Sequence, residues 1–119
     1  MNYNVKGTGL QVTDEIRTYV EKRLAHADKF LQHDTTAHAD VELAFHITEG
    51  KHYRAEFTVS SEGEVFRAEA LGDSLHEAID LAIDELTQEL RKTKKKNLSL
   101  TRSGAGKFKD FIRGFTDRF

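Results

Sequence analysis

The sequence predicts an α+β domain of the order β-α-β-β-β-α, with two helices on one face of a four-stranded mixed sheet. Two segments repeat apolar residues every three or four positions, as the buried face of a helix does. Three segments between them alternate apolar and polar residues, the pattern of strands with one buried face. The length of 119 residues is that of one domain, so we expect these elements to share a single core.

The first two elements are a short strand and a helix. Residues 2–7 alternate weakly and end in Gly7, which predicts a strand. Thr13 and Asp14 supply the chemistry of a helix N-terminus, so a helix is expected over roughly 14–31. Its apolar face consists of Ile16, Tyr19, Val20, Leu24, Ala27 and Leu31.

The alternating segments predict a meander of antiparallel strands. Turns at Glu49-Gly50-Lys51 and Glu62-Gly63 separate them. The residues expected to face the core are Ala39, Val41, Leu43, Phe45 and Ile47, then Tyr53, Ala55, Phe57 and Val59, and finally Phe66, Ala68 and Ala70. Because each strand buries one side only, the other face of the sheet should be polar.

A second helix is expected after a cap at Asp73 or Ser74. Its apolar stripe is the strongest helical signal in the chain and consists of Leu75, Ala78, Ile79, Ala82, Ile83, Leu86 and Leu90. The crossover through the first helix should place the first strand parallel to its neighbour. The whole outline is similar to that of the double-stranded-RNA-binding domain.

The composition excludes several classes of function. Without Cys the chain has no disulfide, thiolate nucleophile or zinc–thiolate site, and a reducing cytoplasm is the expected compartment. No apolar run approaches the twenty or so residues of a membrane span, and no signal peptide is evident. No phosphate-cradling glycine loop or nucleophile elbow occurs. We therefore expect no enzyme activity, no cofactor, no small-molecule substrate and no membrane partner.

Charge is divided unevenly along the chain. Residues 1–90 carry eight Lys and Arg against eighteen Asp and Glu, a net charge of −10. Residues 91–119 carry ten bases against two acids, a net charge of +8. A chain polarised in this way repels polyanions over most of its surface and attracts them at one end.

The densest basic run is Arg91-Lys92-Thr93-Lys94-Lys95-Lys96, at the expected end of the second helix. One or two bases there would complement the helix dipole. Five bases in six residues exceed that need, and contact with nucleic-acid phosphates rewards such density. The run therefore indicates RNA binding.

Two other polar clusters have simpler explanations. Four residues share the outer parity of one expected strand, namely His38, Asp40, Glu42 and His46. Alternate residues of a strand lie about 7 Å apart, which is awkward for one small ion. Asp80 and Asp84 lie one helical turn apart, and a solvated helix face or a cap accounts for them better than acid–base chemistry. We expect no metal site.

The most specific motif is Gly72-Asp73-Ser74-Leu75-His76-Glu77-Ala78-Ile79-Asp80, followed by Ile83-Asp84, Leu86 and the lysine-rich run. Val5-Lys6-Gly7 and residues 12–20 precede it. Over about residues 1–96 these motifs resemble the short ribosome hibernation factors, the family of hibernation promoting factor and ribosome-associated inhibitor A, also called sigma-54 modulation proteins. The order of elements predicted above agrees with that family's fold.

The resemblance implies a protein that binds the small ribosomal subunit between its head and body. There it would block the messenger- and transfer-RNA sites and inhibit translation under stress, without catalysis. Away from the ribosome we expect a monomer.

The resemblance also implies which bases contact ribosomal RNA. Carried over by position, these are Arg17, Arg23, Lys92, Lys94 and Lys96, and this chain adds Arg91 and Lys95. Where the family usually has bases, this chain has Glu85, Gln88 and Glu89. The expected contacts are therefore shifted toward the C-terminal end of the second helix.

Residues 97–119 lie beyond the resemblance and are expected to form a basic tail on the domain of residues 1–96. Residues 97–106 are polar and predict a flexible link. Beyond the link, apolar residues recur at helical spacing and basic residues take many of the other positions. The apolar residues are Phe108, Phe111, Ile112, Phe115 and Phe119. A helix this short needs a surface to fold on, either its own domain, the ribosome, a second copy or a membrane.

Two other functions fit parts of the sequence. A free-standing RNA-binding module of the double-stranded-RNA type has a similar sheet and helices. It reads the duplex with bases at the start of its second helix, where this chain has Leu75-His76-Glu77. A partner-binding regulator would act instead through the Phe-rich tail.

Overall fold

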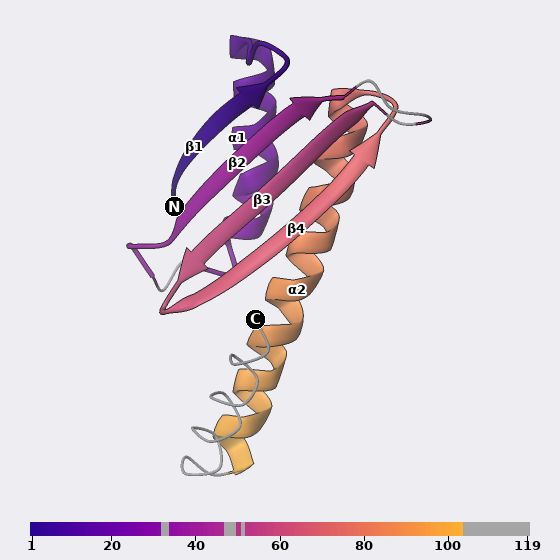
Figure 1. Ribbon diagram of the computed structural model, residues 1–119. Coiled ribbons are helices and arrows are strands. Elements are labelled where there is room, and N and C mark those ends of the chain that lie inside the picture. The colour runs from indigo at the N-terminus through magenta and orange to yellow at the C-terminus, as the bar shows by residue number, and fades with distance from the viewer. Residues whose placement is uncertain (32–33, 47–49, 51, 104–119) are drawn as a thin grey trace.

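The computed structural model describes residues 1–31, 34–46, 50 and 52–103, with side chains up to residue 93 (Figure 1). Its elements are β1 (Asn2–Thr8), α1 (Asp14–Asp28), β2 (His38–Phe45), β3 (Tyr53–Ser61), β4 (Glu64–Gly72) and α2 (Leu75–Ser103). The predicted order β-α-β-β-β-α is confirmed. No helix in these ranges is long and apolar enough to cross a membrane.

The strands form one sheet in the order β1-β2-β3-β4. β1 runs parallel to β2, and the other neighbouring strands are antiparallel, as predicted. Both helices lie behind the same face of this sheet (Figure 1). The core between helices and sheet includes Val20, Leu43, Phe57, Val59, Ile79, Ile83 and Leu86. The strand residues predicted to face the core are buried in it or packed against it, apart from Phe45, which is half-buried and not part of that core, and Ile47, which lies outside the described residues.

α1 begins and ends with identifiable caps. The Thr13 hydroxyl accepts a hydrogen bond from the Ile16 amide at 3.2 Å, which satisfies one of the free N–H groups of the first turn. The helix ends at Asp28 rather than at Leu31, the predicted end. Leu31 is nevertheless buried, because the turn after the helix points it into the core. Because Leu31 continues the apolar spacing of α1, the predicted helix was too long at its C-terminal end.

The loop after α1 is tied to the β3–β4 hairpin by Asp34. The Asp34 carboxylate accepts hydrogen bonds from the Ser61 hydroxyl at 2.7 Å and from the Glu62 amide at 3.1 Å. It also accepts from the hydroxyl and amide of Thr36, at 2.6 and 2.9 Å. These donors, the Thr36 hydroxyl first, lower the pKa of Asp34 to about 2.

The motif from Gly72 to Glu77 explains how β4 turns into α2. A Cβ at Gly72 would lie 2.7 Å from the Ala78 amide nitrogen, so only glycine allows this close approach. The Ser74 hydroxyl accepts from the Glu77 amide at 3.1 Å, and Glu77 accepts in return from the Asp73 amide at 3.3 Å. Of the two predicted caps, the structure therefore selects Ser74, whose hydroxyl satisfies a free N–H group of the first turn.

α2 continues well past the sheet (Figure 1). Among the residues whose side chains are described, Leu90 and Thr93 are the last that are buried, and the helix continues to Ser103. The prediction of a flexible link from Asn97 is therefore wrong over 97–103. The reason is that no glycine or proline interrupts the chain between Gly72 and Gly104, so nothing breaks the helix earlier.

The face of the sheet away from the helices is largely polar, as predicted, although Val65 and Leu71 are exposed on it. Arg54 lies at its centre. Its guanidinium contacts Glu42 at 2.8 Å, Glu56 at 3.1 Å and Glu69 at 2.7 Å, so three strands supply its partners. The hydrogen bond that Arg54 donates to Glu69, and after it the one that it donates to Glu42, raises the pKa of Arg54. The same bond lowers the pKa of Glu69.

Candidate nucleic-acid interface

α1 and α2 are joined by a polar seam. The Tyr19 hydroxyl donates to Asp80 Oδ1 at 2.5 Å, and Arg23 Nη2 donates to Asp84 Oδ1 at 3.2 Å. Arg23 Nε is buried and lies 3.2 Å from Asp80 Oδ1, as an ion pair without hydrogen-bond alignment. The bond to Asp80 raises the pKa of Tyr19. Asp80 and Asp84 thus connect two helices, where the sequence suggested only a solvated face or a cap.

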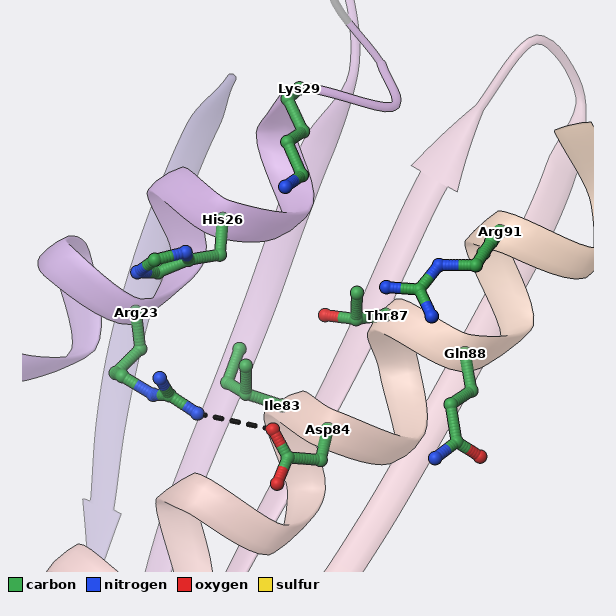
Figure 2. Close-up of a pocket in the computed structure, with 8 residues that line it drawn as sticks. All are labelled: Arg23, His26, Lys29, Ile83, Asp84, Thr87, Gln88 and Arg91. Atoms are coloured by element: carbon green, nitrogen blue, oxygen red, sulfur yellow. Dashed lines mark hydrogen bonds and ion pairs between the residues drawn. The ribbon is translucent and has the colours of Figure 1, made fainter.

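A groove of about 290 Å³ lies beside this seam (Figure 2). It is lined by Arg23, His26, Lys29, Ile83, Asp84, Thr87, Gln88 and Arg91. Counting His26 as neutral, three cations and one carboxylate give the lining a net charge of +2. Ile83 is buried in the core, and the remaining groups are polar. Such a lining suits an anion with several oxygen acceptors.

Helical spacing brings the lining together. Arg23, His26 and Lys29 follow one another at intervals of three residues and so lie along one side of α1 and its C-cap. Asp84, Thr87 and Arg91 follow at three and four residues on α2. Figure 2 shows the two sets facing each other across the groove.

Phe30 supports the basic end of the groove. Its ring is half-buried against the core, and its centroid lies 5.6 Å from Lys29 Nζ and 6.0 Å from Arg91 Cζ. The negative face of an aromatic ring attracts cations at these distances. Phe30 therefore helps to hold both charges beside the groove without neutralising them.

The structure separates the predicted RNA-binding residues into groups. Arg23 and Arg91 come together in the groove. Arg17 is exposed on another side of α1, where its charge acts on the Tyr3 hydroxyl of β1. Lys92 is exposed outside the groove lining, with its Nζ 3.9 Å from Glu89 Oε1.

The remaining predicted contacts are not tested by the structure. Lys94, Lys95 and Lys96 belong to α2, but their side chains lie outside the described part of the chain. The tail residues Phe108, Phe111, Ile112 and Phe115 also lie outside the described residues. Their role in RNA or partner binding stays a prediction.

Three polar residues of the groove, His26, Lys29 and Thr87, were not singled out from the sequence. A signal was present, because Arg23, His26 and Lys29 repeat every three residues on a predicted helix. Three spaced bases are a weaker local signal than a dense run. No local pattern indicates that Arg91, 62 positions from Lys29, closes the same groove.

The outer face of β2 does not gather metal ligands. Within the described ranges no group of three or more His, Asp and Glu side chains is placed to hold a metal ion. His38 Nε2 instead contacts Asp40 Oδ1 at 3.1 Å on the same strand.

Comparison with known proteins gives consistent matches. The sequence profile described as Sigma 54 modulation protein / S30EA ribosomal protein matches residues 3–97. The Ribosome hibernation promotion factor of Bacillus subtilis is 29% identical over 109 residues, which are 91% of this chain and 57% of that protein. That of Picosynechococcus sp. (strain PCC 7002) is 38% identical over 100 residues, 82% of this chain and 51% of that protein. The chain thus spans about half the length of these curated relatives.

A solved structure supports the same assignment. The crystal structure of the Thermus thermophilus Protein Y N-terminal domain is similar, with a TM-score of 0.67 and 36% sequence identity. The similarity covers 78% of this chain and 99% of that domain. The fold predicted from the sequence is therefore one that a related domain adopts in a crystal.

Proposed function

Because the chain belongs to the Sigma 54 modulation protein / S30EA ribosomal protein family, we propose that it is a ribosome hibernation factor. In this proposal it acts in the cytoplasm and binds the small ribosomal subunit through ribosomal RNA. It blocks the messenger- and transfer-RNA sites by occupancy, without catalysis, and so inhibits translation under stress. Away from the ribosome it is a monomer.

The observation that carries the proposal is the basic groove between α1 and α2. Arg23, Lys29 and Arg91 converge there from two helices, with Thr87 and Gln88 as neutral hydrogen-bonding groups. An RNA backbone is a line of phosphates, and each phosphate that a Lys or Arg side chain contacts releases a counterion. Beyond Leu90, α2 carries further bases in sequence as it continues past the groove.

The charge on the rest of the domain supports this choice of face. On the open face of the sheet, Arg54 is surrounded by three carboxylates. On α2, Glu85, Gln88 and Glu89 supply no base where the family usually has them. RNA is therefore attracted to the groove and to the later part of α2, and is repelled elsewhere.

A charge-reversal pair tests the proposal. Arg91→Glu, alone and with Lys29→Glu, should weaken co-sedimentation of the full chain with small ribosomal subunits by about tenfold or more, because each reversal also repels phosphate. Arg67→Glu is the matched control, since it makes the same charge change on the open face of the sheet, where Arg67 is exposed. Parent-like sedimentation of the groove variants would overturn the groove as the binding site.

A second measurement separates the competing functions. A gel shift with isolated duplex RNA should show weak binding, whereas a free-standing RNA-binding module would bind it as strongly as it binds subunits. Deletion of residues 107–119 should leave subunit binding largely in place. If the deletion removed translational inhibition without changing binding, the regulator that acts through its tail would be the better description.

A further inference from the structure

We propose that the two carboxylates that hold Arg23 have opposite roles in RNA binding. Asp80 keeps the guanidinium in position, and Asp84 is the partner that an RNA phosphate displaces. This inference rests on the proposed function, since it concerns the same groove, and it assigns roles to two acids that the groove would otherwise not need.

Asp80 is the fixed partner because it has contacts of its own. Its Oδ1 accepts a hydrogen bond of 2.5 Å from Tyr19, on the facing helix. The Tyr19 ring in turn packs edge-on against His76, with ring centroids 4.5 Å apart. Arg23 Nε, which is buried, lies against this braced carboxylate. Displacing Asp80 would therefore break the seam between α1 and α2.

Asp84 is the exchangeable partner because little else holds it. Its side chain is 66% exposed, against 43% for Asp80, and within the described residues it contacts only Arg23. It lines the groove directly, as Figure 2 shows, and is the one acidic residue of that lining. An exposed carboxylate can turn into water at small cost, since exposed ion pairs contribute little stability.

The chemistry of the exchange is balanced and non-covalent. Arg23 Nη2 donates to a carboxylate oxygen before binding and to a phosphate oxygen afterwards. Asp84 is then hydrated by water, and the contact with Asp80 keeps the Arg23 guanidinium in the groove. A phosphate has to compete with Asp84 for Arg23, so an isolated inorganic phosphate gains little. A phosphodiester chain that also reaches Lys29 and Arg91 gains enough to displace it.

Three variants that each remove one negative charge test the assignment. Asp84→Asn should tighten binding of the full chain to small subunits, because the competitor is weakened, by about two- to fivefold. Asp80→Asn should weaken binding by a similar factor, because Arg23 loses its anchor. Asp40→Asn is the matched control: it makes the same substitution at an exposed acid on the open face of the sheet, away from the groove lining, and binding should change little.

The opposite signs make the test decisive. If simple electrostatics governed binding, all three variants would bind more tightly, and the proposal would be wrong. If both aspartates only supported the fold, both would bind more weakly, which would also overturn it. Tyr19→Phe provides a second route to the anchor without a change of charge, and it should weaken binding as Asp80→Asn does.

Two further controls separate this inference from the proposed function. In an Arg23→Ala background, Asp84→Asn should lose its gain, because Asp84 acts through Arg23; a persistent gain contradicts the exchange. If Arg91→Glu binds subunits normally, the groove itself is not the RNA site. If Arg91→Glu weakens binding but Asp84→Asn does not tighten it, the groove stands and only the exchange fails.

Discussion

Arg54 and Arg23 are both held by carboxylates, yet they lie on opposite sides of the sheet and have different neighbours. Arg54 meets Glu42, Glu56 and Glu69 on the open face, and its side chain is 20% exposed. The bases that face outward there, Lys6, Arg54 and Arg67, are outnumbered by Asp40, Glu42, Glu56 and Glu69, so that three positive and four negative charges leave −1.

In the groove between the helices the balance is reversed, since three cations and one carboxylate leave +2. Arg23 forms ion pairs with two carboxylates. Lys29 and Arg91 line the same groove, and neither of these two residues forms an ion pair with the residues that the structure describes. The difference teaches that an excess of unpaired charge, rather than the presence of arginine, marks a surface that can bind RNA. In the proposal Arg54 stabilises the fold and Arg23 binds RNA, and the following predictions test that division.

The largest effect is expected from the basic run at the end of α2. Reversal of three bases (Lys92→Glu, Lys94→Glu and Lys96→Glu) should reduce small-subunit binding by about a hundredfold or more and flatten its dependence on salt. Sucrose-gradient sedimentation at two salt concentrations measures both. Lys6→Glu combined with Arg67→Glu, on the open face, should bind nearly as the parent does. Equal losses in the two sets would break the comparison between the faces.

Arg54→Ala should destabilise the fold and leave RNA binding intact. Without the guanidinium, Glu42, Glu56 and Glu69 face one another across adjacent strands, and the free energy of unfolding should fall by about 2 kcal/mol. Urea unfolding measures it. Arg67 lies on the same face but forms no ion pair with the described residues. Arg67→Ala should therefore change the free energy of unfolding by no more than about 0.5 kcal/mol. Loss of subunit binding by folded Arg54→Ala protein would contradict the division.

The sequence predicted the sheet and the start of α2 well, because the signals there are local. Alternation in β2 and β3 follows directly from a sheet with one buried face, and the Ser74 cap lies three residues from its partner Glu77. The sequence failed at the ends of both helices. Leu31 continues the apolar spacing after α1 has ended, and a polar composition at Asn97 does not stop a helix.

The groove was predicted only in part, for a different reason. Arg23 was named from the family resemblance and Arg91 from the dense basic run, but their meeting depends on how α1 packs against α2, and no local pattern encodes that packing. The ion pairs of Arg23 are equally non-local, since Asp80 and Asp84 lie about sixty positions away. Side-chain chemistry between elements is therefore what the structure adds.

Low pH should destabilise the fold through Asp34, whose carboxylate accepts hydrogen bonds from several donors. The pKa of Asp34 is lowered from 3.8 to about 2, so its stabilising effect is complete above pH 3.8 and is lost as the pH falls through 2. Asp34→Asn should lower the urea midpoint at pH 7 and make stability less dependent on pH between about 4 and 2. Thr36→Val, which removes the strongest donor, should give part of this change. If the stability of Asp34→Asn depended on pH as steeply as that of the parent, the hydrogen bond from Ser61 to Asp34 would not form in solution.

The smallest effect is expected at Phe30, which tests whether the basic end of the groove is held in place or merely charged. Phe30→Leu keeps a similar apolar volume against the core and removes the ring that attracts Lys29 and Arg91. An exposed cation–π contact is worth about 0.5–1 kcal/mol, so subunit binding should weaken by about two- to fivefold while the charge of the groove is unchanged. Phe30→Tyr, which keeps an aromatic face, should restore it. If Phe30→Leu and Phe30→Tyr bind alike, charge alone accounts for the contribution of Lys29 and Arg91.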